Sequence, residues 1–476
     1  MMNKHHLAGL LLLCLCTSFT LTYSKFPESK QAFIKELGTY IMAAKKESAT
    51  KTFKRFEQHF KSGAFDEGET KQIMEVCNRM LEKKLAAHPY FTDYLTVLSE
   101  FKNSKNEKEK LLEWNQVIYQ MLGQLEKRPF KTFLQFSIHF FEKQSLHYSP
   151  KGSSWYFKEA DYQLRFEEQQ PLIHFDQVDI YAARKDQQLL IAATAGTHYP
   201  LKRSWQGEGG KVQWEQQGME NVYSELSTYE LDVSKTRYEA ENAQLYYPDL
   251  FGDQAITGHL VDKLVVKGKG KESSYPRFES TEGPLTIEGI GAGLVYKGGF
   301  RLHGRTVNGA GTDEQKAELL AYKANGELAF RSRARAFSIQ QGDRITGEQV
   351  ETILYAYGQD SIYHPSVQFK YVPEEHFLQL QRGKRGSDRN PFYDSYHGVN
   401  IETEKIDWYL EADSIVFNRK NAAIGNGQYK VAFESDAYFN VQHYRKLQNV
   451  ADYNPIASLR ALSLREKSQI IKAEQW

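Results

Sequence analysis

Hydrophobic and polar positions follow two different periods along this chain. Between residue 26 and about residue 145, apolar residues recur at steps of three and four, the spacing of one helical face. Two such sets are Phe33, Ile34, Leu37, Tyr40 and Ile41, and Ile73, Val76, Cys77, Met80 and Leu81. Further helices are predicted at about 89–102, 107–126 and 129–144. Residues 25–147 are therefore predicted to form an all-α domain, an antiparallel bundle or a solenoid.

An aromatic stripe marks the last of these helices. Its members are Phe130, Phe133, Phe136, Phe140 and Phe141. A stripe at this spacing packs in a core or lines a groove for a partner, and the core is the commoner use.

From about residue 150 the chain alternates apolar and polar residues, the period of a half-buried strand. The clearest unit is VQFKYVPEEHFLQLQR, in which Val367, Phe369 and Tyr371 share one face. VPEE turns the chain, and Leu378 and Leu380 share one face of the return strand. The expected fold class is α+β, with a large all-β region over 148–445 of stacked antiparallel sheets, jellyroll-like or sandwich-like.

Three segments in this region echo one another. AITGHLVDKLVV and RITGEQVETILYAYG share I-T-G before an alternating run, and TIEGIGAGLVYKGGF is a looser third copy. Such copies indicate stacked β units, although glycine turns before apolar strands look alike in any sandwich.

Both ends of the chain differ from its middle. A short polar start and the apolar run Leu7–Thr22 predict a secretory signal peptide over 1–24, cleaved before Lys25. Cys14 and Cys16 offer a lipoprotein signal as the alternative, but no small residue precedes either one. Residues 446–476 turn helical again, which predicts either a C-terminal docking helix or a chain truncated from a longer protein.

Composition narrows the possible environment. Cleavage would leave Cys77 as the last cysteine, so stability must come from burial rather than from disulfides. This favours the periplasm or outer membrane of a Gram-negative bacterium, with peripheral membrane association as a further option. The 61 basic and 60 acidic side chains nearly cancel, which argues against a nucleic-acid binder.

Familiar catalytic signatures are absent from the sequence: it has no G-x-S-x-G, H-E-x-x-H, phosphate-binding loop or C-x-x-C motif. The candidate enzyme site comes from DSIYHP and DSYH, whose Asp360, His364, Asp394 and His397 offer a base and an orienting acid beside a serine, or metal ligands. Asp and Ser before aromatic residues more often mark turns. No metal or other cofactor is expected.

Two further motifs are candidates for ligand binding. Trp205 and Trp214 flank the glycine turn of WQGEGGKVQW, where they could stack on sugars or pack across a hairpin. In LAFRSRARAFSI, Arg331, Arg333 and Arg335 would share one strand face opposite Ser332, Ala334 and Ala336. Such arginines form a track for an anionic ligand, or pair with acids on neighbouring strands such as Asp343, Glu348 and Glu351.

The β-region resembles the stacked β-jellyroll domains of the OstA-like lipopolysaccharide-transport family. The resemblance rests on YEAENAQLYYPDLFGDQAITGHLVDKLVV, with its strand, short turn and I-x-G strand. SIYHP and PFYDSYH are similar to segments of very large uncharacterised bacterial envelope proteins. The first resemblance implies an apolar groove between sheets that shields acyl chains, with arginines outside to meet phosphates.

These observations favour an exported, non-enzymatic envelope protein with a structural or binding role toward a protein, glycan or glycolipid partner. The alternative is an exported hydrolase built on the Asp/His cluster at 360–397.

Overall fold

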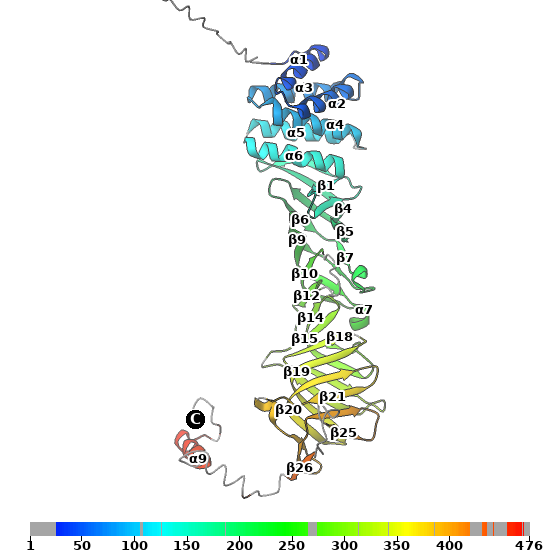
Figure 1. Cartoon of the computed structure of the whole chain (residues 1–476), viewed down its shortest axis with the longest axis vertical. Coiled ribbons are helices and arrows are strands. Elements are labelled where there is room, and N and C mark those ends of the chain that lie inside the picture. Colours follow the sequence, from blue (N-terminus) through cyan, green and yellow to red (C-terminus); the bar gives the residue numbers. More distant parts are fainter. Residues whose placement is uncertain are drawn as a thin grey trace, which may run out of the picture. The chain divides into compact units, whose positions relative to one another are not determined.

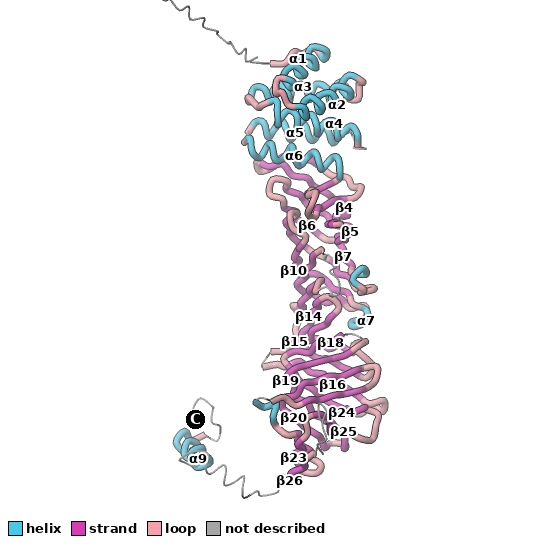
Figure 2. Tube along the Cα trace, in the orientation of Figure 1, coloured by secondary structure: helices cyan, strands magenta, loops and turns pink. Residues whose placement is uncertain are grey.

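The computed structural model confirms the α+β fold class: helices come first, and a large antiparallel β-region follows (Figures 1 and 2). The described residues are 25–104, 108–124, 126–185, 187–264, 274–312, 314–340, 342–384, 386–418, 431–435, 441, 455–468 and 470. The predicted signal peptide at 1–24 lies outside them. Within the predicted helical ending, α9 (Pro455–Glu466) is described.

The chain forms two compact units. Unit 1 holds residues up to Gly210 together with Thr228–Tyr238, and unit 2 holds Lys211–Ser227 and the chain from Glu239 onward. The change from helix to strand lies between Lys143 and Ser145, well before the boundary between the two units. The helices and the first strands share unit 1 because they bury their apolar faces against each other.

The helices of unit 1 stack in two layers. Their bounds are α1 (Lys30–Met42), α2 (Glu47–Lys61), α3 (Glu67–Glu82), the π-helical turn η1 (Ala87–Phe91), α4 (Thr92–Asn103), α5 (Lys108–Gly123) and α6 (Lys127–Lys143). In one layer α2 packs on α4 and α4 on α6, and in the other α3 packs on α5 (Figure 1). These three contacts each skip one helix, as in a solenoid, one of the two predicted arrangements, whereas α1 packs on the next helix, α2.

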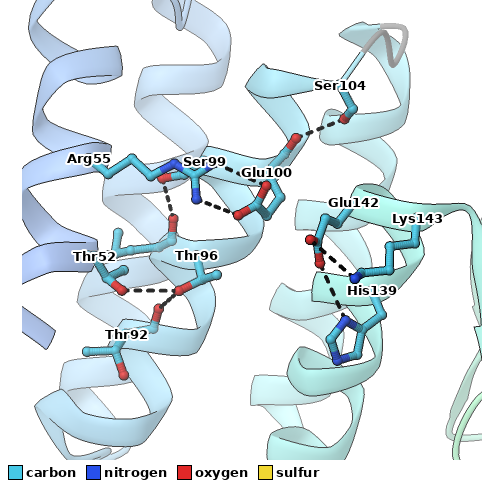
Figure 3. Close-up of polar contacts among 11 residues, drawn as sticks. Thr52, Arg55, Thr92, Thr96, Ser99, Glu100, Ser104, His139, Glu142 and Lys143 are labelled. Carbon is cyan, nitrogen blue, oxygen red and sulfur yellow. Dashed lines mark hydrogen bonds and ion pairs between the residues drawn. The ribbon is translucent and has the colours of Figure 1, made fainter. Parts of the chain in front are cut away.

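Polar pairs link neighbouring helices of one layer (Figure 3). Arg55 on α2 donates from two guanidinium nitrogens to the two carboxylate oxygens of Glu100 on α4, at 2.5 and 3.2 Å. Thr52 and Thr96 lie 3.5 Å apart between the same helices. These contacts fix the register of the two helices.

The described chain is anchored at its first residues. The Phe26 backbone N–H donates to Oδ1 of Asn78 at 2.7 Å. The Phe26 ring is buried and meets Phe33, Tyr40 and Phe91 edge to face. The helical core therefore extends to within one residue of Lys25.

The aromatic stripe of α6 packs in the core, as predicted. Phe130, Phe133, Phe140 and Phe141 are buried, and Phe136 is half-buried. Phe140 lies between the helices and the first strands, with its ring centroid 5.2 Å from that of Phe157. The stripe joins the helices of unit 1 to its strands.

The strands of unit 1 form two sheets that share their long members. The strands are β1 (Ser145–His147), β2 (Ser154–Phe157), β3 (Gln163–Glu167), β4 (Gln170–Arg184), β5 (Gln187–Tyr199), β6 (Ser204–Glu208) and β9 (Thr228–Asp232). One sheet has the order β3, β4, β5, β6, β9, and the other has β1, β2, β4, β5. One half of β4 and of β5 thus belongs to the first sheet, and the other half of both strands belongs to the second sheet.

Unit 2 repeats this plan on a larger scale. Short strands and helices at its start are β7 (Lys211–Gln213), η2 (Glu215–Gln217), β8 (Tyr223–Glu225), β10 (Arg237–Tyr246, from Glu239 in this unit), α7 (Pro248–Phe251) and β11 (Ala255–Lys263). The central strands are β12 (Arg277–Ser280), β13 (Leu285–Ile287), β14 (Leu294–His303), β15 (Thr306–Ala310), β16 (Ala317–Tyr322), β17 (Leu328–Ala334), β18 (Ala336–Gln340), β19 (Arg344–Tyr357) and β20 (Asp360–Val372). The last elements before α9 are β21 (Phe377–Gln381), η3 (Gly386–Arg389), β22 (Phe392–Asp394), β23 (Val399–Glu402), β24 (Lys405–Tyr409), β25 (Ile415–Asn418) and β26 (Ala432–Ser435).

Two sheets of unit 2 face each other across one core. Sheet I has the order β11, β12, β14, β15, β18, β19, β20, β21, β24, β25. Sheet II has the order β13, β14, β16, β17, β19, β20, β22, β23, β26. The long strands β14, β19 and β20 belong to both sheets, which is the stacked antiparallel arrangement expected from the sequence.

Long strands pass from one sheet to the other at a corner. At two of these corners two consecutive residues are exposed, Glu241–Asn242 in β10 and Glu348–Gln349 in β19, whereas in β20 the consecutive residues Ser366 and Val367 are both buried. Ala193, Asn242 and Gln349 have φ between +52° and +54°. An extra residue at such a bulge reverses which face of the strand is buried.

The repeated I-T-G segments have a common physical basis. A Cβ on Gly258 would lie 2.4 Å from the Phe278 ring, and one on Gly347 would lie 3.2 Å from the Phe337 ring. In both cases an aromatic ring from the neighbouring strand covers the glycine. The looser third copy differs, because Gly289 approaches the backbone of Asp249 instead.

Aromatic rings fill the space between the two sheets near β17, β19 and β20. Phe330, Phe369 and Tyr371 are buried, and Phe330 meets both of the other rings edge to face. At this level of unit 2 the space between the sheets is therefore filled by side chains.

Candidate binding surface

The arginines of β17 take part in a ladder of alternating charge on the outer face of sheet II. Lys297, Glu318, Arg333 and Glu351 are direct cross-strand neighbours on β14, β16, β17 and β19. Arg333 Nε lies 3.1 Å and Arg331 Nε 2.8 Å from the same Glu318 Oε1. Glu351 also receives Lys316 at 3.4 Å. Cross-strand pairing is therefore what Arg331 and Arg333 do here, chiefly with Glu318, which was not among the acids named from the sequence.

The expectation of three arginines on one face holds for only two of them. Arg335 lies at a bend between β17 and β18 and is exposed together with Ala336. The buried set changes there from Ser332 and Ala334 to Phe337. This bend is another sheet corner, so strict alternation could not be continued through Arg335.

A hollow of about 830 Å³ adjoins the ladder. Its wall includes Arg333, Glu318 and Glu351, and Arg301 and Glu279, which lie 2.6 Å apart on neighbouring strands. Because acids and bases alternate and pair along this wall, it presents no continuous positive track to an anion.

Asp394 and His397 form a turn. Asp394 Oδ1 accepts from the backbone N–H groups of Tyr396 and His397 at 2.9 and 3.4 Å, and Oδ2 lies 2.7 Å from His397 Nδ1. Asp394 is buried, and the turn joins β22 to β23. Forming a turn is the commoner use of such residues, as stated in the sequence analysis.

Asp360 and His364 share a face of β20, but they contact different groups. Asp360 accepts from the Ser395 hydroxyl at 3.0 Å. His364 is buried; its Nδ1 accepts from the Ser366 N–H at 3.0 Å and its Nε2 donates to the Asn390 carbonyl at 2.8 Å. Burial lowers the pKa of His364, and an Nδ1 atom that accepts a hydrogen bond carries no proton.

The four side chains therefore do not assemble a nucleophile, base and orienting acid. The candidate nucleophiles are Ser361 and Ser395. The Ser395 hydroxyl is bonded to Asp360 and to the Ser361 N–H, and His397 is bonded to Asp394. His364, the base that would serve Ser361, has both ring nitrogens bonded to backbone groups. Within the described residues, no group of three or more His, Cys, Asp or Glu side chains is placed to hold a metal ion.

Trp205 and Trp214, the two candidates for stacking on sugars, are both buried. Trp205 is 0% exposed and donates from Nε1 to the Tyr229 hydroxyl at 3.2 Å, with its ring over Gly196. Trp214 is 1% exposed and donates to Asp262 Oδ2 at 2.9 Å. Neither indole face can stack on a sugar, because packing inside its own unit covers it.

The outer face of sheet I carries a row of polar side chains that sequence inspection missed. Asn308, Ser338, Thr346, Lys370 and Gln379 are direct neighbours on five successive strands. Arg301 on β14 precedes this row and Asp407 on β24 follows it. Neighbouring strands lie about 4.8 Å apart, so the row offers a polar group at nearly regular steps across the sheet.

A hollow of about 600 Å³ follows this row. Its polar lining is Asn308, Arg335, Ser338, Thr346, Glu348, Gln368, Lys370, Gln379 and Gln381. Lys370 forms no ion pair with any residue that the structure describes. Gln379 Nε2 donates to Asp407 Oδ1 at 3.0 Å, and Asp407 is itself held by Lys405 and Asn418. The amide of Gln379 is thereby fixed in orientation.

Two aromatic rings lie on the strands that carry Gln379 and Asp407. Phe377 and Tyr409 are cross-strand neighbours on β21 and β24, with ring centroids 4.8 Å apart. They lie two residues from Gln379 and Asp407, on the same outer face, and Tyr409 is 54% exposed. The polar row and this aromatic pair together are called the outer platform below.

The sequence contained a signal for part of this surface. Leu378 and Leu380 were recognised as one face of a hairpin, which leaves Phe377, Gln379 and Gln381 on the opposite face. The rest of the row comes from strands whose register depends on bulges, and alternation alone does not give that register.

Comparisons with protein-family models, curated proteins and solved structures found no match. No helix among the described residues is long and apolar enough to cross a membrane.

Proposed function

We propose that this chain is an exported, non-enzymatic envelope protein that binds a ligand on its β-region. The observation that carries the proposal is that the candidate catalytic groups hold the fold together by hydrogen bonds. Both ring nitrogens of His364 bind backbone groups, and the Asp394 carboxylate holds the turn that contains His397. A binding role does not require these residues to act as nucleophile, acid or base.

Export is supported by the sequence and by the anchor at Phe26. Cleavage before Lys25 would remove the apolar leader and leave intact the bond from the Phe26 N–H to Asn78. N-terminal sequencing of the protein recovered from its native envelope tests this, with Lys25 expected as the first residue. An intact Met1 on the envelope form would contradict it.

The non-enzymatic part is tested by His397→Ala and Asp360→Asn, both near the surface. Ligand capture from envelope extracts should be unchanged in each variant, and hydrolysis of ester, amide and glycoside model substrates should stay at background. Measurable turnover that disappears in His397→Ala, with an unchanged melting curve, would favour the hydrolase alternative.

A further inference from the structure

We propose that the outer platform of sheet I binds an extended acidic polysaccharide, laid across the strands from the aromatic pair toward Asn308. This inference rests on the proposed binding function and gives its ligand class. Three independent features of the platform point to this chemistry.

The first feature is the aromatic pair. Tyr409 exposes just over half of its surface beside Phe377, on the open face of an antiparallel sheet. An exposed aromatic ring presents an apolar face with a polar tip, which suits the apolar face of a pyranose ring. The buried Trp205 and Trp214 cannot do this, so the glycan site predicted from the sequence moves to a different pair of aromatics.

The second feature is the kind and spacing of the polar groups. Most of the polar side chains that line the hollow are amides or hydroxyls: Asn308, Ser338, Thr346, Gln368, Gln379 and Gln381. These side chains both donate and accept hydrogen bonds, which matches the hydroxyl groups of a sugar. One group per strand repeats at about 4.8 Å, close to the length of one sugar residue in an extended chain.

The third feature is charge. Lys370 lies between Thr346 and Gln379 in the row and has no acidic partner among the described residues. Among the described residues that line the same hollow, Glu348 is the one acid. A carboxylate on the sugar chain would supply the missing partner of Lys370.

Neighbouring side chains fix the orientation of the Gln379 amide in the outer platform. Asp407 holds the amide nitrogen of Gln379, so the carbonyl oxygen of Gln379 is left to accept from a sugar hydroxyl. Lys405 and Asn418 hold Asp407 in turn, at 2.6 and 3.1 Å. Residues fixed before binding lose less conformational entropy when a ligand arrives.

Affinity electrophoresis tests the proposal. The mature chain is run in native gels that contain polygalacturonate, alginate or hyaluronan, with dextran as the neutral polymer. We expect retardation by at least one acidic polymer, weakening as salt is raised, and little retardation by dextran. Tyr409→Ala and Lys370→Glu should each weaken binding about tenfold or more.

Matched controls carry the same substitutions elsewhere. Tyr396→Ala removes another exposed tyrosine, which lies in the β22–β23 turn, and Lys151→Glu reverses the charge of an exposed lysine in unit 1. Both should bind like the wild type.

Absence of retardation in all acidic gels would overturn the proposal, and so would retention that survives both platform substitutions. Equal retardation by dextran would overturn the acidic assignment. None of these results bears on His397 or Asp360, so a failed glycan proposal remains distinguishable from a failed non-enzymatic proposal.

Discussion

Arg333 and Glu318 face each other across the β16–β17 pair, with Nε and Oε1 3.1 Å apart. Arg331, two residues earlier on the same outer face of β17, lies 2.8 Å from the same oxygen. One carboxylate thus balances two arginines, and the third arginine of the sequence motif lies at the bend that follows. The motif is explained by sheet construction and does not require a ligand.

Glu318→Gln should lower the free energy of unfolding by about 0.5–1 kcal/mol, because the ion pairs are partly exposed and screened by solvent. The loss should shrink in 1 M salt, where the remaining arginines repel each other less. Urea unfolding at low and high salt measures both. A loss that is independent of salt would show that packing, not charge, makes the contact.

Gly258→Ala should destabilise unit 2 by about 2 kcal/mol or more, because the new Cβ would lie 2.3 Å from the Glu279 carbonyl oxygen and 2.4 Å from the Phe278 ring. Gly283→Ala is the matched control, since a Cβ there meets nothing within 4 Å. Thermal unfolding compares the two. Equal melting temperatures would contradict the covered-glycine account of the I-T-G repeat.

His198 should make unit 1 sensitive to acid. Burial lowers the pKa of His198 to about 3 in the folded protein, against about 6.5 for an unperturbed histidine. Between these values the unfolded state binds more protons, so stability falls as pH decreases from about 6.5 toward 3, by up to about 1.4 kcal/mol per pH unit.

The comparison is with His198→Leu, which cannot take up this proton. The difference in unfolding free energy between wild type and variant should change with pH across that window and stay constant above pH 7. Urea unfolding at a series of pH values measures it. Parallel curves would contradict the assignment.

Asp394→Ala should cost about 1–2 kcal/mol, because two backbone N–H groups and the His397 ring lose their acceptor. The folded variant should still bind polysaccharide like the wild type. Loss of binding in folded protein would place Asp394 in the site and contradict its role as a turn residue.

Local periodicity was enough to predict the helices, the antiparallel β-region and the core position of Phe133 and Phe140. It also gave the hairpin that carries Gln379. The corners could not be predicted, because the pairs of exposed residues at Glu348–Gln349 and Arg335–Ala336 reverse the buried face inside stretches that otherwise alternate like ordinary strands. No glycine or proline adjoins Arg335–Ala336, and Gly347 before Glu348 does not by itself indicate a reversal. Every strand assignment beyond such a corner changes face.

The candidate sites failed for a related reason. Sequence inspection favoured residue types that stand out, such as tryptophan and histidine, and the fold buries Trp205, Trp214 and His364 in its core. The outer platform is made of ordinary residues, and their alignment across strands exists only in the folded sheet. Its register depends on pairings between segments more than 20 residues apart, such as Asn308 with Ser338.

Native mass spectrometry of the protein purified from the cells that produce it tests the central claim most directly. The wild type should carry an acidic glycan that is absent from the Lys370→Glu, Tyr409→Ala double variant and present on the Tyr396→Ala control. A wild type without bound glycan, or a double variant that keeps it, would contradict the outer platform as the binding site.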